Sequence, residues 1–322
     1  MNVPAAVLIL ALAAPSLTQT PAAVPDASAS GVGRALEQAD AEVQAGRRAE
    51  AKRLLAAAAE RFTSVRALMQ LARLQSEDGE AANALATLDR ARTLAPNTEE
   101  VLSAIAQVSL AIRRPVLAIL ALEPLTRLAP SVAQHHYLFG VALMQAGDMP
   151  AAVDALEKAR RLDPAHSLTA IALGIAFNNR KMFAEAKSVL ERVLERDPDN
   201  VEAIAALSET EEGLGNLDSA DTHAARALTA APTHPTAQLV IGMVLMKRGR
   251  HAEARAALEL AAAADPDSPK IYYQLSLAAA RLGDAKGSAR NRELYQQKLR
   301  AMEARIEELR RAGMPSRGGM SR

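Results

Sequence analysis

Hydrophobic residues recur along most of the chain in stretches of about 13 residues, spaced so that they fall on one side of a helix. The stretches come in pairs, and a short turn separates the two members of each pair. One turn position is glycine in five of seven pairs, across the column Gly79, Arg113, Gly147, Lys181, Gly215, Gly249 and Gly283. Glycine favours such a turn because it reaches left-handed backbone conformations without steric cost. The pattern predicts a series of helix-turn-helix units.

Prolines set the period of these units. Six of them lie 34 residues apart, at Pro96, Pro130, Pro164, Pro198, Pro232 and Pro266. Each follows the second amphipathic stretch of a pair, where it would end the helix because proline lacks the N–H and clashes with the preceding turn. The period therefore predicts an array of 34-residue repeats.

Small residues keep the same phase. One column, just after a large apolar residue of the first stretch, contains Ala72, Ala106, Gly140, Gly174, Ser208, Gly242 and Ser276. A second column, in the second stretch, contains Ala84, Ala118, Ala152, Ala186, Ala220, Ala254 and Ser288. We expect these positions to mark where two helix backbones approach closely, since a bulky side chain there would hold the helices apart.

The columns closely resemble the tetratricopeptide repeat family, in which a large residue precedes Gly or Ala in the first helix, Ala recurs in the second, and proline closes the unit. The resemblance covers about Ala35 to Tyr295. It implies an all-α, right-handed α-solenoid whose first helices line a concave channel for protein partners. We expect a degenerate repeat at 34–64, followed by units at 65–98, 99–132, 133–166, 167–200, 201–234, 235–268 and 269–298.

Residues 1–33 read as a signal peptide followed by a flexible linker. Ala5 to Ala14 form a run of ten apolar residues ended by Pro15, which suits a signal-peptide core and is too short for a spanning helix of about 20 residues. A signal peptide normally has a positively charged stretch before its apolar core, but no Lys or Arg precedes this run. A mis-assigned start codon or a disordered apolar leader is therefore the alternative to a signal peptide. The expected location is periplasmic or secreted, with a cytoplasmic location as the alternative.

The C-terminal end, 299–322, reads as a helix extension followed by a disordered basic tail. Arg300 stands where the closing proline would be, so the last helix can continue to about Ala312. Apolar residues follow a 4-3-4-3 spacing along it at Tyr295, Leu299, Met302, Ile306 and Leu309. The extension would cap the last repeat or form a short dimer contact. The leader and the tail are the only segments expected to touch a membrane.

Two features predict local details of the helices. Thr98, Asn200 and Ser268 stand where the following helix needs an N-cap. Pro124 falls inside the second helix of unit 99–132 and is expected to kink or shorten it.

Composition and motifs favour binding over chemistry. There is no cysteine, which excludes disulfides and thiolate catalysis, and a net charge of +1 gives no basic field for nucleic acid. No catalytic, phosphate-binding or metal-binding motif occurs, and the adjacent His135 and His136 would point about 100° apart on a helix. We therefore expect no enzyme activity and no cofactor or metal.

The phase of the first helices predicts which side chains point into the channel. Most are apolar, and the expected groove residues are Tyr137, Leu138, Val141, Met144, Leu168, Ile171, Ile175, Asn178, Asn179, Leu239, Met243, Met246 and Tyr273. The fifth unit is the acidic exception, with Glu202, Glu209 and Glu212. The Lys, Arg and Asn set with which the family grips a peptide carboxylate is absent from matching positions. These side chains would bind a peptide or helix, or simply pack between repeats.

The sequence thus favours a non-catalytic scaffold that binds a protein or peptide in an apolar groove, as an assembly factor or co-chaperone of a bacterial envelope. A structural spacer or self-associating subunit is the alternative, and the regulatory arm of an enzyme is a remote one. The partner and the oligomeric state stay open.

Overall fold

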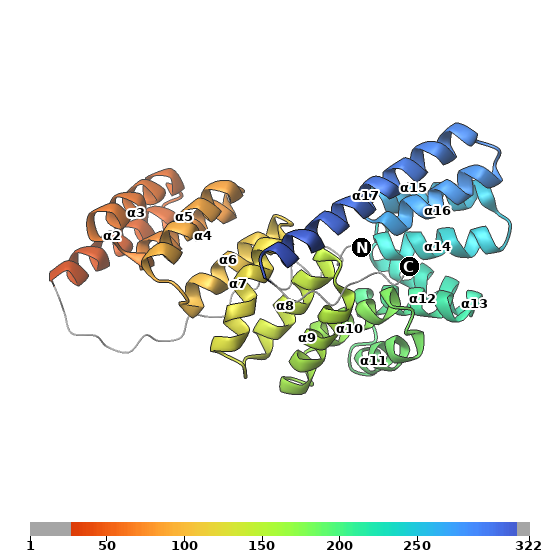
Figure 1. Ribbon diagram of the computed structural model, residues 1–322, viewed down its shortest axis with the longest axis horizontal. Coiled ribbons are helices and arrows are strands. Elements are labelled where there is room, and N and C mark those ends of the chain that lie inside the picture. The colour runs from red at the N-terminus through yellow and green to blue at the C-terminus, as the bar shows by residue number, and fades with distance from the viewer. Residues whose placement is uncertain (1–26, 314–322) are drawn as a thin grey trace. The chain divides into compact units, whose positions relative to one another are not determined.

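The computed structural model describes residues 27–313, which contain helices and no strands. Consecutive helices pack as hairpin pairs, and within each of two units of the chain a pair packs on the next (Figure 1). The helices are α2 (Ala27–Gln44), α3 (Arg48–Phe62), α4 (Val65–Glu77), α5 (Ala81–Leu94), α6 (Glu99–Ala111), α7 (Pro115–Leu128), α8 (Ala133–Ala146), α9 (Met149–Leu162), α10 (Ser167–Asn179), α11 (Phe183–Arg196), α12 (Val201–Leu214), α13 (Leu217–Ala230), α14 (Pro235–Lys247), α15 (His251–Ala264), α16 (Pro269–Arg281) and α17 (Ala285–Arg311). The expected all-α solenoid of stacked helix pairs is confirmed.

The turn inside each repeat explains the glycine column. All seven residues of that column have positive φ, from 56° at Arg113 to 98° at Gly147. Arg113 and Lys181 adopt the same left-handed conformation as the glycines, although it costs a non-glycine residue about 1–2 kcal/mol. The turn geometry is therefore set by the repeat, and glycine is its least strained occupant.

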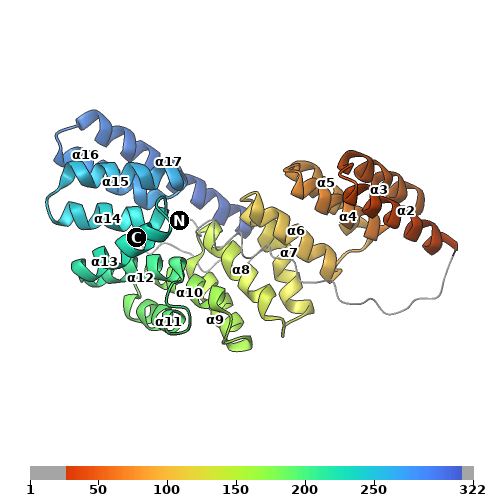
Figure 2. The same cartoon turned by 180° about the vertical axis from the view of Figure 1, so that it is seen from behind.

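Contacts divide the chain into two compact units. The N-terminal unit contains α2 to α7, and the C-terminal unit contains α8 to α17. The opposite view shows the same helix pairs from behind (Figure 2). Each unit is a stack in which a second helix contacts the first helix of the following repeat.

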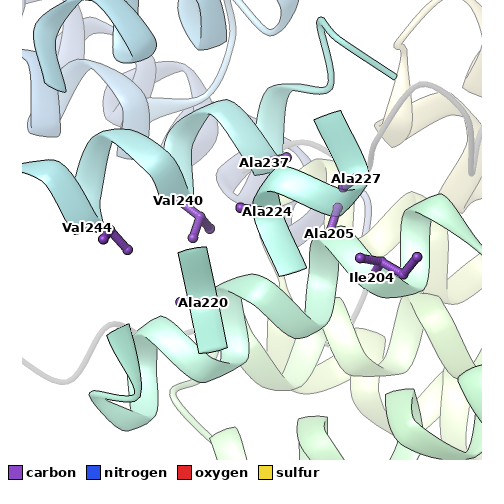
Figure 3. Packing of buried hydrophobic residues seen from close by; sticks show 8 residues of the cluster. All are labelled: Ile204, Ala205, Ala220, Ala224, Ala227, Ala237, Val240 and Val244. Atoms are coloured by element: carbon purple, nitrogen blue, oxygen red, sulfur yellow. The ribbon is translucent and has the colours of Figure 1, made fainter. Parts of the chain in front are cut away.

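Small residues allow the close helix packing that the sequence predicts. A Cβ on Gly140 would lie 2.5 Å from Cγ of Leu156, so this leucine of α9 occupies the space above the glycine of α8. Gly174 and Gly242 meet leucines of their own second helices in the same way. Alanines of α13 likewise fill the layer between α12 and α14 in the cluster Ile204, Ala205, Ala220, Ala224, Ala227, Ala237, Val240 and Val244 (Figure 3).

Several local expectations are corrected. The predicted linker up to Gly33 ends earlier, because Ala27–Gly33 already belong to α2, where Gly31 lies against the ring of Phe62. Pro124 does not shorten α7, which has 14 residues like α5, the second helix of the preceding repeat.

All three expected N-cap residues, Thr98, Asn200 and Ser268, occupy the N-cap position, and among them Asn200 makes the capping hydrogen bond. The side chain of Asn200 accepts a hydrogen bond from the Ala203 N–H at 3.0 Å. Thr98 instead donates its hydroxyl to the Ala95 carbonyl, and Ser268 makes no side-chain cap bond.

The last helix extends as expected, and its C-cap is Ala312. Met302 and Leu309 are buried, and Met302 lies over Gly147 in the turn between α8 and α9. Lys298 of the same helix binds Asp267 with 2.8 Å between Nζ and Oδ1. These contacts lie within the C-terminal unit, so α17 caps the array by crossing back to an earlier repeat.

The apolar leader and the tail beyond Gly313 lie outside the described residues. Within 27–313 no helix is both long enough and apolar enough to cross a membrane.

Candidate binding pocket on the first helices

Most of the predicted groove residues lie in the core. Nine are buried: Tyr137, Leu138, Val141, Met144, Ile171, Ile175, Asn178, Leu239 and Met243. Leu168, Asn179 and Met246 are half-buried, and Tyr273 is 45% exposed and packs against the ring of Tyr295. The apolar first-helix residues are covered because neighbouring first helices contact one another as well as their second helices. Most of these side chains therefore pack between helices, which is the alternative to ligand binding that the sequence left open.

Asn178 has a structural position. Its Nδ2 donates to the Ala206 carbonyl at 2.9 Å, and its Oδ1 lies 2.9 Å from the hydroxyl of Thr210, so the side chain joins α10 to α12. The amide is buried among these partners. Asn178 thus holds two successive first helices together.

A small, open pocket with a cavity volume of about 50 Å³ is lined by residues from four first helices of the C-terminal unit. Its floor is the face of α12 that carries Glu202, Ala206 and Glu209, one and two helical turns apart. The small side chain of Ala206 leaves room between the two carboxylates. The remaining lining residues are Ile175, Asn179, His234, Pro235, Thr236, Leu239, Asp265, Ser268, Lys270 and Ile271.

One side of the pocket is closed by an ion pair between distant repeats. Nζ of Lys270, in the first turn of α16, lies 2.6 Å from Oε1 of Glu209 on α12. Burial disfavours the charge of Lys270, but Glu209 and then Glu212 outweigh it, so the pKa of Lys270 is raised above its usual value. Lys270 therefore stays charged and neutralises Glu209.

The other carboxylate on the floor is less well satisfied. Nε2 of His234 lies 3.2 Å from Oε1 of Glu202, yet the geometry is too poor for a hydrogen bond. Nδ1 of His234 accepts the Ala237 N–H as the N-cap of α14, which leaves Nε2 to carry the ring proton of the neutral form. Among the described residues, neither His234 Nε2 nor Glu202 Oε2 has a hydrogen-bond partner, although both atoms are buried.

Sequence reasoning found part of this pocket. It placed Ile175, Asn179 and Leu239 on the first-helix face and singled out Glu202 and Glu209 as an acidic exception. It missed Lys270 and His234, which come from the starts of α16 and α14. No sequence pattern links them to α12, because the twist of the array decides which helix starts meet its face.

Metal binding has no support in the described part of the chain. Residues 27–313 contain no group of three or more His, Asp or Glu side chains arranged to hold a metal ion.

Comparison with known proteins identifies the fold. Two family profiles described as tetratricopeptide repeat match the sequence, one at 143–209 and the other at 36–98, 104–167, 205–269 and 239–290. No curated protein matches the sequence.

Solved structures share the architecture at low sequence identity. A tetratricopeptide repeat protein from Parabacteroides merdae ATCC 43184 has a TM-score of 0.65 and 15% identity, covering 77% of this chain and 99% of its own. The APC/C hetero-tetramer Cut9-Hcn1 contains a chain with a TM-score of 0.57 and 12% identity, covering 80% of this chain and 52% of its own. The profiles together match well over half of the residues, and the chain belongs to the tetratricopeptide repeat family.

Proposed function

We propose that the protein is a non-catalytic scaffold that binds a peptide or a helix of a partner protein on the first-helix face of its C-terminal unit. The observation that carries this proposal is the pocket between α10, α12, α14 and α16, which is open to a ligand and contains buried polar atoms that the described chain does not satisfy. Half-buried or exposed residues such as Leu168, Met246 and Tyr273 offer further contact area on the same helices.

The proposed surface differs from the expected groove in its chemistry. It combines apolar walls with carboxylates, where the sequence predicted mainly aliphatic and Met side chains. A mixed surface of this kind gives orientation as well as affinity, because a few placed polar groups select one ligand pose.

A peptide-display selection on the full chain tests the proposal. Selected peptides are then titrated by fluorescence anisotropy against Asn179→Trp, which fills the pocket, and Arg180→Trp, which places the same ring on the adjacent exposed residue. We expect Asn179→Trp to weaken binding at least about tenfold and Arg180→Trp to change it less than about twofold, a gap of more than about 1 kcal/mol. Recovery of no binding peptide, or equal loss in both variants, would contradict the proposal.

We also propose that the scaffold works outside the cytoplasm, as an assembly factor or co-chaperone of a bacterial envelope. The support is the apolar leader Ala5 to Ala14, in which Ala11-Leu12-Ala13 has the small-residue pattern of a signal-peptide cleavage site. N-terminal sequencing of the protein from its host should find a mature chain that begins at Ala14. A chain that begins at Met1 would count against export by cleavage.

Self-association through the last helix has less support. Met302 and Leu309, two of the apolar residues that a dimer would use, are buried within one chain. Light scattering of the full chain and of a truncation after Arg300 checks this, and we expect the same oligomeric state for both.

A further inference from the structure

We propose that the last turns of α17, residues 299–311, are a clasp that closes the first-helix side of the C-terminal unit and opens when a partner binds. The inference rests on the proposed function, since it names how access to that binding surface is controlled. The observation that carries it is that one short stretch of α17 holds both ends of the stack of repeats from α8 to α16.

The clasp begins where α17 runs past the start of α16. Nζ of Lys298 lies 2.8 Å from Oδ1 of Asp267, just before α16 begins at Pro269. Residues 299–311 therefore extend beyond the last repeat, for about 20 Å at 1.5 Å per residue. Asp267 stands between Asp265 and Ser268, which line the pocket, so the clasp leaves α16 at the edge of that pocket.

The other end of the clasp rests on the first repeat of the unit. Met302 lies over Gly147 in the turn between α8 and α9, and α17 contacts α8 (Figures 1 and 2). Only about 6 Å of helix separates Lys298 from Met302. The row of first helices from α8 to α16 takes four steps of about 8–10 Å between axes, so a straight row would place its ends too far apart for this stretch.

The row must therefore be curved, and α17 bridges its ends. Successive first helices contact one another along the row, so they form its inner side. A bridge between the ends of a curved row lies on that inner side, which is the face on which we place partner binding. A partner that lies along this face meets the clasp, and closure and binding compete.

The contact between the clasp and its seat is weakly built. Gln145 and Asp148 flank Gly147, and Arg305 lies one helical turn from Met302. Among the described residues, both polar atoms of the Gln145 amide, Oδ2 of Asp148 and Nε of Arg305 are buried without a hydrogen bond. Because water satisfies such atoms once they are exposed, their burial opposes the closed state.

The remaining attachments are also easily broken. Met302 and Leu309 are the two buried apolar side chains of the clasp. The side chains of Lys298 and Asp267 are 26% and 49% exposed, and ion pairs with this exposure contribute little and are screened by salt. A partner can therefore displace the clasp, and the fraction of open molecules sets the apparent affinity.

The chain offers a matched pair of variants that test the clasp. Gly147 and Gly215 each follow a first helix with a left-handed backbone, at φ of 98° and 86°, so alanine strains both turns alike. A Cβ on Gly147 would lie 2.4 Å from Cγ of Met302, whereas a Cβ on Gly215 meets no atom within 4 Å. Gly147→Ala therefore pushes Met302 off its seat, and Gly215→Ala is the control.

The first experiment measures opening in the full chain. The sequence contains no cysteine, so spin labels on Lys158→Cys of α9 and Glu308→Cys of α17, both exposed positions, are the only ones present. We expect pulsed electron paramagnetic resonance to show one dominant separation, which becomes longer and broader in Gly147→Ala and in Met302→Ala and stays the same in Gly215→Ala. An unchanged separation in both opening variants, or an equal change in Gly215→Ala, overturns the inference.

The second experiment separates the clasp from the scaffold function. Peptides from the display selection should bind Gly147→Ala and Met302→Ala at least about threefold tighter than Gly215→Ala, and saturating peptide should lengthen the separation of the labels. Equal affinity in all three variants, with a separation that peptide does not change, overturns the inference and leaves the scaffold function standing. Absence of peptide binding to the closed and the opened chain alike removes the scaffold function, and its control with it.

Discussion

Asn178 and Asn179 are neighbours in sequence and differ in what they do. Asn178 is buried and bonded to α12, whereas Asn179 is half-buried and lines the pocket. Successive residues of a helix point about 100° apart, so one amide faces the next repeat while the other faces the ligand site. The roles of two identical residues are thus separated by helix geometry.

We expect Asn178→Ala to destabilise the C-terminal unit by about 1–2 kcal/mol, because two buried hydrogen bonds between α10 and α12 are lost, although the Thr210 hydroxyl can still donate to the Ala206 carbonyl. Asn179→Ala is the matched control and should cost less than about 0.5 kcal/mol. Urea unfolding followed by circular dichroism measures both. Equal stability of the two variants would show that the interhelical bonds are unimportant.

At the scale of an element, α17 differs from every other second helix. It has 27 residues where α15 has 14, because no proline closes the last repeat. The extra turns place Met302 over Gly147, where a side chain on residue 147 would collide with it. The helix therefore links the last repeat to the first repeat of the C-terminal unit.

Met302→Ala should loosen this link. Removal of a buried Met side chain costs about 2 kcal/mol or more in a packed core, and we expect a value near the lower end here because the contact involves one turn. Hydrogen exchange of the amides at 143–149 should become faster, since they surround the uncovered turn. Arg300→Ala, exposed on the same helix, is the control, and similar exchange in both variants would rule out a capping role for Met302.

At the scale of the whole molecule, the two units differ in their histidine content, and we expect them to respond differently to acid. All six histidines lie in the C-terminal unit, and the N-terminal unit has none. Burial lowers the pKa of His166 and His223 below 6.5, although Asp163 and Glu211 oppose it. Because the unfolded chain then takes up protons first, the stability contributed by these neutral rings is complete above about pH 6.5 and is lost as the pH falls further.

Acidification from pH 7.5 to 5.5 should therefore destabilise the C-terminal unit and leave the N-terminal unit nearly unchanged. Hydrogen exchange resolved by peptide and corrected for intrinsic rates measures the two units in one sample. A change of equal size in both units, or a gain in stability of α8 to α17, would contradict the expectation. The double variant His166→Gln with His223→Gln should reduce the difference between the units.

The sequence by itself determined the repeat and its turns. Prolines at a fixed period, small residues in two columns and a glycine column describe local events: a helix stop, a close approach and a positive φ. Each of these events depends on residues within one repeat. The position of Gly140 therefore predicts a close helix contact, which the structure shows to be with Leu156 of the same repeat. The length of α17 follows from the same local logic, through Arg300 in place of proline.

Tertiary structure alone decided which first-helix residues face a ligand. Phase gives the direction of a side chain from its own helix axis, but Tyr137 and Met243 are buried because neighbouring helices cover them. The pocket likewise joins Glu209 to Lys270, 61 residues away. Such a pairing depends on the small rotation between successive repeats, which accumulates along the array and has no signature within a single 34-residue unit.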